Sequence, residues 1–131
     1  MKNIDKKIAV IFPDIGYHAD KPLLYYAIDI ADFCGYEHIC VNYGELNARQ
    51  IVYTPIQETL SYYMENAIVF HGTKDSWCKT KDLKEVCTKN HNQLWILEDA
   101  NHSLEVNSTM KNIDNLKMIM KKTEDYIKHR N

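Results

Sequence analysis

The chain has 131 residues, of which 45% are hydrophobic and 26% are charged, and its formal net charge is −2. A chain of this length and composition can bury a core of its own, so we expect one domain spanning residues 1–131. The small negative charge gives no electrostatic basis for binding nucleic acid or an anionic membrane. The sequence contains no apolar run near the ~18 residues of a membrane span. The short apolar run after the charged first residues does not form a signal peptide, so we expect a cytoplasmic location.

Cysteine and histidine positions give no indication of a metal site. The four cysteines show no CxxC spacing, and we expect buried free thiols at Cys34 and Cys40. The histidines that could contribute metal ligands fall on different predicted loops and strands: His18, His38, His71 and His91. We therefore expect neither a metal nor a cofactor.

Continuous apolar runs, bounded by Gly, Pro and polar residues, indicate strands that are buried on both faces. Five strands are predicted, at residues 7–12, 37–43, 50–53, 67–70 and 93–97. Helices are predicted at residues 22–34, 58–63, 80–88 and 113–127. Pro22 is typical of a helix start and Gly35 of a helix end. The alternation predicts an α/β fold, a three-layer α/β/α sandwich around a mostly parallel sheet of about five strands.

Two chemically distinctive side chains follow neighbouring predicted strands. Asp75 lies in the loop after strand 67–70, and His102 lies in the loop after strand 93–97. A carboxylate that holds a histidine in one tautomer and stabilises its cation is the arrangement used in acyl transfer. We expect the two side chains within about 2.6–3.2 Å of each other. The alternatives are an ordinary loop carboxylate and a histidine that faces solvent.

Much of the sequence resembles a small bacterial α/β hydrolase. The resemblance is carried by residues 8–46, by QIVYTPIQETLSYY, by HGTKDSW around Asp75 and by EDANHSLE around His102. It implies hydrolysis of a carboxylic ester or similar acyl compound, with Asp75 orienting His102 as general base. It also implies an oxyanion site in the turn after the first strand, at Asp14, Ile15 and Gly16, although the family usually has glycine where this chain has Asp14.

The sequence departs from that family at the nucleophile. An α/β hydrolase carries G-x-S-x-G on a strand-to-helix turn, but no two of the four glycines here enclose a serine. The serines are Ser61, Ser76, Ser103 and Ser108, and none lies at a predicted elbow. Cys78 is an alternative nucleophile, with an incidental thiol as the simpler interpretation. We infer that several tens of residues have been lost near residues 44–50, leaving a reduced α/β-hydrolase fold.

This loss leaves several functions open. The first is a catalytically incomplete hydrolase that still accommodates a small ester-like ligand. Most of the many tyrosines are expected to pack in the core or at its rim, and the alternative is that some of them line a remaining pocket. The second is a non-enzymatic binding or assembly module, because removal of the central strand would leave sheet edges through which copies of the chain could associate. The third is a product of a damaged gene that has no function.

Overall fold

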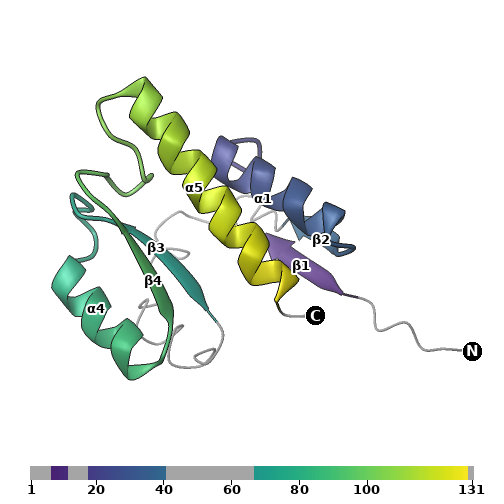
Figure 1. Cartoon of the computed structure of the whole chain (residues 1–131), viewed down its shortest axis with the longest axis horizontal. Helices are drawn as coiled ribbons and strands as arrows, with labels where there is room; N and C mark the ends of the chain where they lie inside the picture. The colour runs from purple at the N-terminus through teal and green to yellow at the C-terminus, as the bar shows by residue number, and fades with distance from the viewer. Residues whose placement is uncertain (1–6, 12–17, 41–66, 130–131) are drawn as a thin grey trace, which may run out of the picture. The chain divides into compact units, whose positions relative to one another are not determined.

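The computed structural model describes residues 7–11, 18–40 and 67–129. These residues form four strands and three helices (Figure 1). They belong to two compact units, Met1–Glu45 with Leu116–Asn131, and Leu46–Asn115. None of the three helices has the length and apolar character that a membrane-spanning helix needs.

The first unit contains a strand–helix–strand arrangement of β1 (Ile8–Ile11), α1 (Pro22–Phe33) and β2 (Glu37–Cys40). The two strands pair in parallel, as expected. Pro22 starts α1, where its missing N–H costs nothing. Gly35, at φ +81°, ends the helix in the left-handed conformation that glycine adopts most readily.

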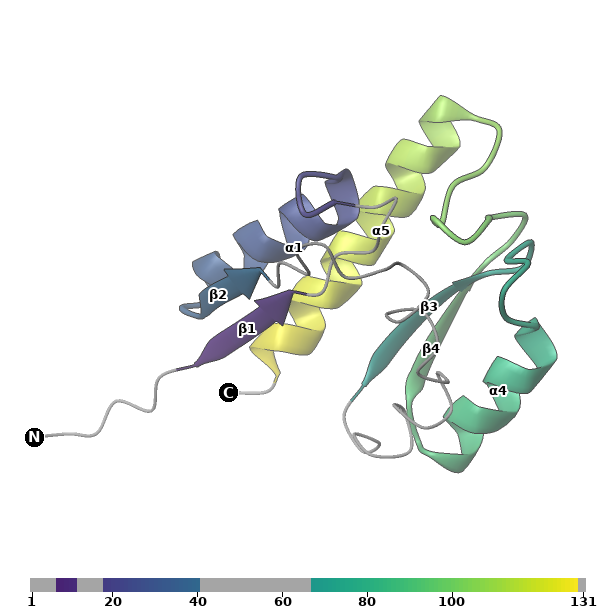
Figure 2. The same cartoon turned by 180° about the vertical axis from the view of Figure 1, so that it is seen from behind.

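The second unit repeats the pattern with β3 (Ile68–Gly72), α4 (Thr80–Lys89) and β4 (Gln93–Leu97), and α4 contacts β4 (Figure 2). The strands pair in parallel from Ile68 opposite Gln93 to Gly72 opposite Leu97. Apolar residues spaced four apart on α4 give this helix a buried face. Among the described residues of this unit, the buried apolar ones are Leu83, Cys87, Leu97 and Ala100. Both strands thus end at the same edge, and their following loops start side by side.

The last helix, α5 (Thr109–Lys128), begins four residues earlier than the apolar spacing predicts. Ser108 precedes it, and the Ser108 hydroxyl accepts a hydrogen bond from the backbone N–H of Lys111 at 3.4 Å. Serine is a favoured residue at this capping position. The apolar spacing begins at Ile113, so it misses the first turn, where Thr109, Lys111 and Asn112 are polar.

The sheet differs from the prediction. The described strands form two separate two-stranded parallel sheets, β1–β2 and β3–β4, and not one sheet of about five strands. The predicted strand at 50–53, the predicted helix at 58–63 and the inferred deletion near 44–50 lie outside the described residues. Within residues 7–11, 18–40 and 67–129 no strand pairs with both sheets, and an apolar run predicts a strand without specifying the edge with which it pairs.

Candidate functional site

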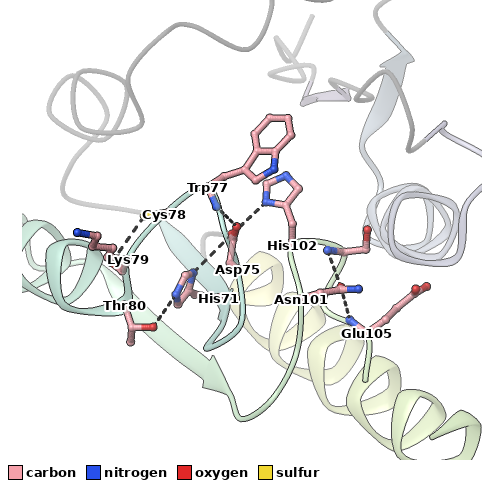
Figure 3. Close-up of polar contacts among 10 residues, drawn as sticks. His71, Asp75, Trp77, Cys78, Lys79, Thr80, Asn101, His102 and Glu105 are labelled. Carbon is pink, nitrogen blue, oxygen red and sulfur yellow. Dashed lines mark hydrogen bonds and ion pairs between the residues drawn. The ribbon is translucent and has the colours of Figure 1, made fainter. Parts of the chain in front are cut away.

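The loop after β3 holds Asp75 in a fixed orientation. The backbone N–H of Asp75 donates to the carbonyl of Gly72 at 3.0 Å, which closes a tight turn. One carboxylate oxygen, Oδ1, accepts the backbone N–H of Trp77 at 2.8 Å (Figure 3). This contact is an Asx turn, a common way for aspartate to order a loop. The side chain is only 10% exposed, so the carboxylate is both buried and oriented.

The loop after β4 is ordered by Asn101, the residue before His102. The Asn101 side-chain oxygen accepts backbone N–H groups from Ser103 at 2.9 Å and from Glu105 at 3.1 Å. The Asn101 backbone N–H in turn donates to the carbonyl of Glu105 at 2.9 Å. Leu104 adopts φ +62°, an uncommon left-handed conformation within this tight loop. Hydrogen bonds therefore hold the backbone both before and after His102.

Hydrogen bonds also join the two loops. The Thr73 backbone N–H donates to Leu97 O at 3.0 Å, and the Lys74 backbone N–H donates to Ala100 O at 2.9 Å. In the other direction, the Asp99 backbone N–H donates to the Thr73 hydroxyl at 2.8 Å. These bonds extend the contact between the two strands into the loops that follow them.

The two loops bring Asp75 and His102 together. Nδ1 of His102 lies 3.0 Å from Oδ2 of Asp75, within the expected hydrogen-bonding range (Figure 3). The His102 ring stacks on the Trp77 indole, with ring centres 4.9 Å apart and planes 15° apart. An ionised carboxylate can only accept hydrogen bonds, so Nδ1 is the donor in this contact, and in the neutral imidazole the lone pair then lies on Nε2. The arrangement can therefore present Nε2 as a general base. The catalytic roles of both residues stay predictions.

The surroundings of Asp75 favour its charged form. Burial raises the pKa of Asp75, but the hydrogen bonds from His102 and from the Trp77 backbone lower it, as do the positive charges of His102 and His71 when their rings are protonated. The lowering effects prevail, and the pKa lies below its ordinary value of 3.8. Asp75 is therefore a carboxylate at neutral pH, as the orientation of a histidine requires.

A second imidazole lies beside this carboxylate. His71 is 3% exposed, its Nδ1 is 3.9 Å from Oδ2 of Asp75, and its Nε2 is 2.9 Å from the Thr80 hydroxyl. The sequence pattern places His71 only among histidines that do not form a metal-ligand set, and it does not predict this contact. The available signal was a polar residue at the end of an apolar strand, four residues before Asp75.

Cys78 has the opposite electrostatic character from an activated nucleophile. Burial and the negative charges of Asp75 and Asp82 raise the pKa of the Cys78 thiol. Because the thiolate is the reactive form, this direction disfavours Cys78 as a nucleophile. The prediction of buried thiols in the first unit is wrong, since Cys34 is half-buried and Cys40 is exposed. Cys34 lies at the end of a surface helix and Cys40 at the end of a short sheet, where little covers them.

Other predicted site residues do not join the pair. Asp14, Ile15 and Gly16, the predicted oxyanion residues, lie outside the described residues. Within the described part of the chain, no group of three or more histidine, cysteine or acidic side chains could hold a metal ion. A hollow of about 380 Å³ lies next to the loop after β4. Its lining includes Lys74 and Glu105 but neither Asp75 nor His102.

Comparison with known proteins yields no relative: no protein-family model, curated protein or solved structure matches the chain. Function is therefore inferred from the geometry of the site and from the sequence resemblance.

Proposed function

We propose that this chain is a reduced α/β-hydrolase-like protein that keeps the acid and the base of an ester-hydrolase site but has no nucleophile. The observation that carries the proposal is the 3.0 Å contact between Asp75 Oδ2 and His102 Nδ1. The two residues follow neighbouring parallel strands, β3 and β4, in the chain order acid and then base. That order is the one found in α/β hydrolases.

The chemistry of the pair defines the class of ligand. A histidine oriented by a carboxylate takes the proton of an attacking hydroxyl and later returns it to the leaving group. The ancestral substrate in this proposal is a carboxylic ester or a similar acyl compound. Without a serine on an elbow there is no hydroxyl for His102 to activate, so no covalent acyl intermediate forms. The chain alone would then be catalytically inactive, with Asp75 and His102 retained as a pair.

Two measurements test the proposal. First, the purified chain should not hydrolyse p-nitrophenyl acetate and should not react with a fluorophosphonate probe. Labelling of one serine that disappears in His102→Ala would show a working nucleophile and overturn the inactivity. Second, proton NMR should show the His102 Nδ1–H as a low-field resonance that is lost in Asp75→Asn. If no such resonance exists at low temperature and neutral pH, the acid–base pair itself is refuted.

A second candidate function is an assembly module in which copies of the chain associate. One face of the β1–β2 sheet favours it, because Val10 and Ile39 are direct partners in the register and Ile8 lies on the same face. The three side chains are 48%, 53% and 48% exposed in the order Val10, Ile39 and Ile8. Light scattering separates the two candidates. A monomer at high concentration argues against assembly, and a dimer that Val10→Ser dissociates supports it.

A further inference from the structure

His71 is a buried titratable side chain that the proposed acid–base pair does not use. Its ring lies between Asp75 and Thr80 (Figure 3). Nδ1 is directed at Oδ2 of Asp75, the same oxygen that His102 contacts, and Nε2 lies 2.9 Å from Oγ1 of Thr80. One carboxylate oxygen therefore faces two imidazole rings, one buried and one half-exposed.

The contacts of His71 define where its proton lies. The distance of 3.9 Å from Nδ1 to Oδ2 is too long for a hydrogen bond, but the carboxylate charge still acts across it because both side chains are largely shielded from solvent. A negative oxygen favours an N–H over a lone pair on the nitrogen that faces it. With the proton on Nδ1, Nε2 accepts a hydrogen bond from the Thr80 hydroxyl. The hydroxyl could donate or accept, so Asp75 selects the tautomer and Thr80 fixes the ring.

The same contacts close the loop that carries Asp75. His71 lies next to the last residue of β3, and Thr80 is the first residue of α4. Their hydrogen bond joins the two ends of the loop at residues 73–79. Within that loop, the Trp77 N–H holds Oδ1 of Asp75. The carboxylate is thus held at Oδ1 by the loop backbone and at Oδ2 by His102, and His71 Nδ1 faces the same Oδ2 from 3.9 Å.

We propose that His71 is a positioning residue: fixed by the Thr80 hydroxyl at Nε2, its Nδ1–H directs Oδ2 of Asp75 toward His102. The inference rests on the proposed function, in which Asp75 and His102 form the acid–base pair. It assigns His71 no contact with a substrate. It also explains why an apolar strand ends in a buried imidazole that is bonded to the start of the next helix.

The wild-type chain gives the first test and needs no substitution. Long-range ¹⁵N–¹H correlation spectra at neutral pH distinguish the two tautomers of each histidine ring. We expect His71 to carry its proton on Nδ1 and to show Nε2 as an unprotonated nitrogen. Finding the proton on Nε2 of His71 would overturn the inference directly.

A matched pair of variants gives the second test. Thr80→Val removes the hydroxyl and keeps the shape, whereas Thr80→Ser keeps the hydroxyl. In Thr80→Val we expect a mixture of His71 tautomers, a weakened His102 Nδ1–H resonance and an upward shift of the pKa of Asp75. In Thr80→Ser all three should stay close to wild type. A Thr80→Val protein that retains the wild-type tautomer and the wild-type Asp75 pKa would refute the positioning role.

The readouts separate this inference from the proposed function. If the His102 Nδ1–H resonance is absent from the wild type, the proposed acid–base pair is refuted, and the proposed role of His71 is refuted with it. If that resonance is present but the Thr80 pair of variants does not affect it, only the role of His71 fails. Should Thr80→Val not fold, as dispersion of its amide resonances would reveal, the wild-type tautomer still decides the question.

Discussion

Gly72 lies directly against the backbone carbonyl of Ala100. A Cβ atom placed on residue 72 would come within 2.2 Å of that oxygen and within 2.6 Å of the Asn101 carbonyl oxygen. Both obstacles are backbone atoms, which cannot rotate away as a side chain could. The end of β3 and the loop of His102 therefore approach closely at a position that has no side chain, and this approach keeps the acid and the base within hydrogen-bonding distance.

Gly72→Ala should separate the two loops. We expect a loss of about 1–3 kcal/mol in the free energy of unfolding, as overpacking typically costs, together with loss of the His102 Nδ1–H resonance. Urea unfolding and proton NMR measure the two effects. Gly35→Ala is the control, because Gly35 has φ +81° and a Cβ atom added there would have no neighbour within 4 Å. It should lower stability and leave the His102 resonance in place. An unchanged resonance in Gly72→Ala would contradict the expected separation.

His102→Ala should raise the pKa of Asp75. The substitution removes a hydrogen bond and a charge that lower this pKa, and burial, which raises it, remains. A titration followed by the ¹³C resonance of the Asp75 carboxyl group measures the shift. His38→Ala, which breaks the exposed 2.7 Å pair with Asp32 in the other unit, is the matched control and should leave Asp75 unchanged. A downward shift in His102→Ala would show that the contact does not stabilise the carboxylate.

Local sequence signals predict much of each unit, because they report directly on local structure. Apolar runs mark the strands, and Pro22 and Gly35 mark the ends of α1. The proximity of Asp75 and His102 follows from one general rule, that neighbouring parallel strands end at the same edge of a sheet. Residues that closely follow the ends of two such strands are therefore often near each other in space.

Features that depend on packing between distant residues are harder to predict. The division of the strands into two sheets depends on which strand edges hydrogen-bond to each other. The alternation of apolar and polar residues along a strand does not specify its neighbour. The role of His71 depends on a ring that meets Thr80 across a loop, and Gly72 matters only because Ala100 lies against it. A glycine at the end of a strand gives no sign by itself that another backbone approaches it.

Asn101→Ala should loosen the loop that carries His102. The side-chain oxygen of Asn101 accepts the N–H groups of Ser103 and Glu105, and alanine leaves both without that acceptor. We expect a loss of about 1 kcal/mol in stability and faster hydrogen exchange at these two amides. Asn101→Asp keeps an acceptor oxygen at the same place and should retain most of the protection. Equal exchange rates in both variants would show that the side chain does not order the loop.

Asp75 should make the free energy of unfolding depend on pH in the acidic range. Its pKa is lower in the folded chain than the ordinary value of 3.8, so the unfolded chain binds the proton more readily. Asp75 therefore stabilises the fold above about pH 4, and this contribution is lost as the pH falls through the folded-state pKa. Asp75→Asn should be less stable than wild type at pH 7 by about 1–3 kcal/mol, and the difference should shrink toward pH 3.

Urea unfolding of both proteins between pH 7 and pH 3 checks this dependence. Asp114→Asn, which changes an exposed carboxylate on α5, is the control and should stay within about 0.5 kcal/mol of wild type at each pH. A difference between Asp75→Asn and wild type that grows on acidification would mean that the pKa of Asp75 is raised by folding and not lowered.

The Asp75 carboxylate should also slow alkylation of the Cys78 thiol. Burial raises the pKa of this thiol and the charge of Asp75 raises it further, so little thiolate is present at neutral pH. Asp75→Asn removes one of these charges, and alkylation of Cys78 by iodoacetamide should become about two- to tenfold faster. Peptide mapping resolves Cys78 from the other thiols. Asp99→Asn serves as the control, because that carboxylate pairs with Lys74 at 2.8 Å and does not affect the pKa of Cys78. If Cys78 of the wild type instead reacts faster than it does in Asp75→Asn, the carboxylate activates the thiol and Cys78 becomes a candidate nucleophile for the site.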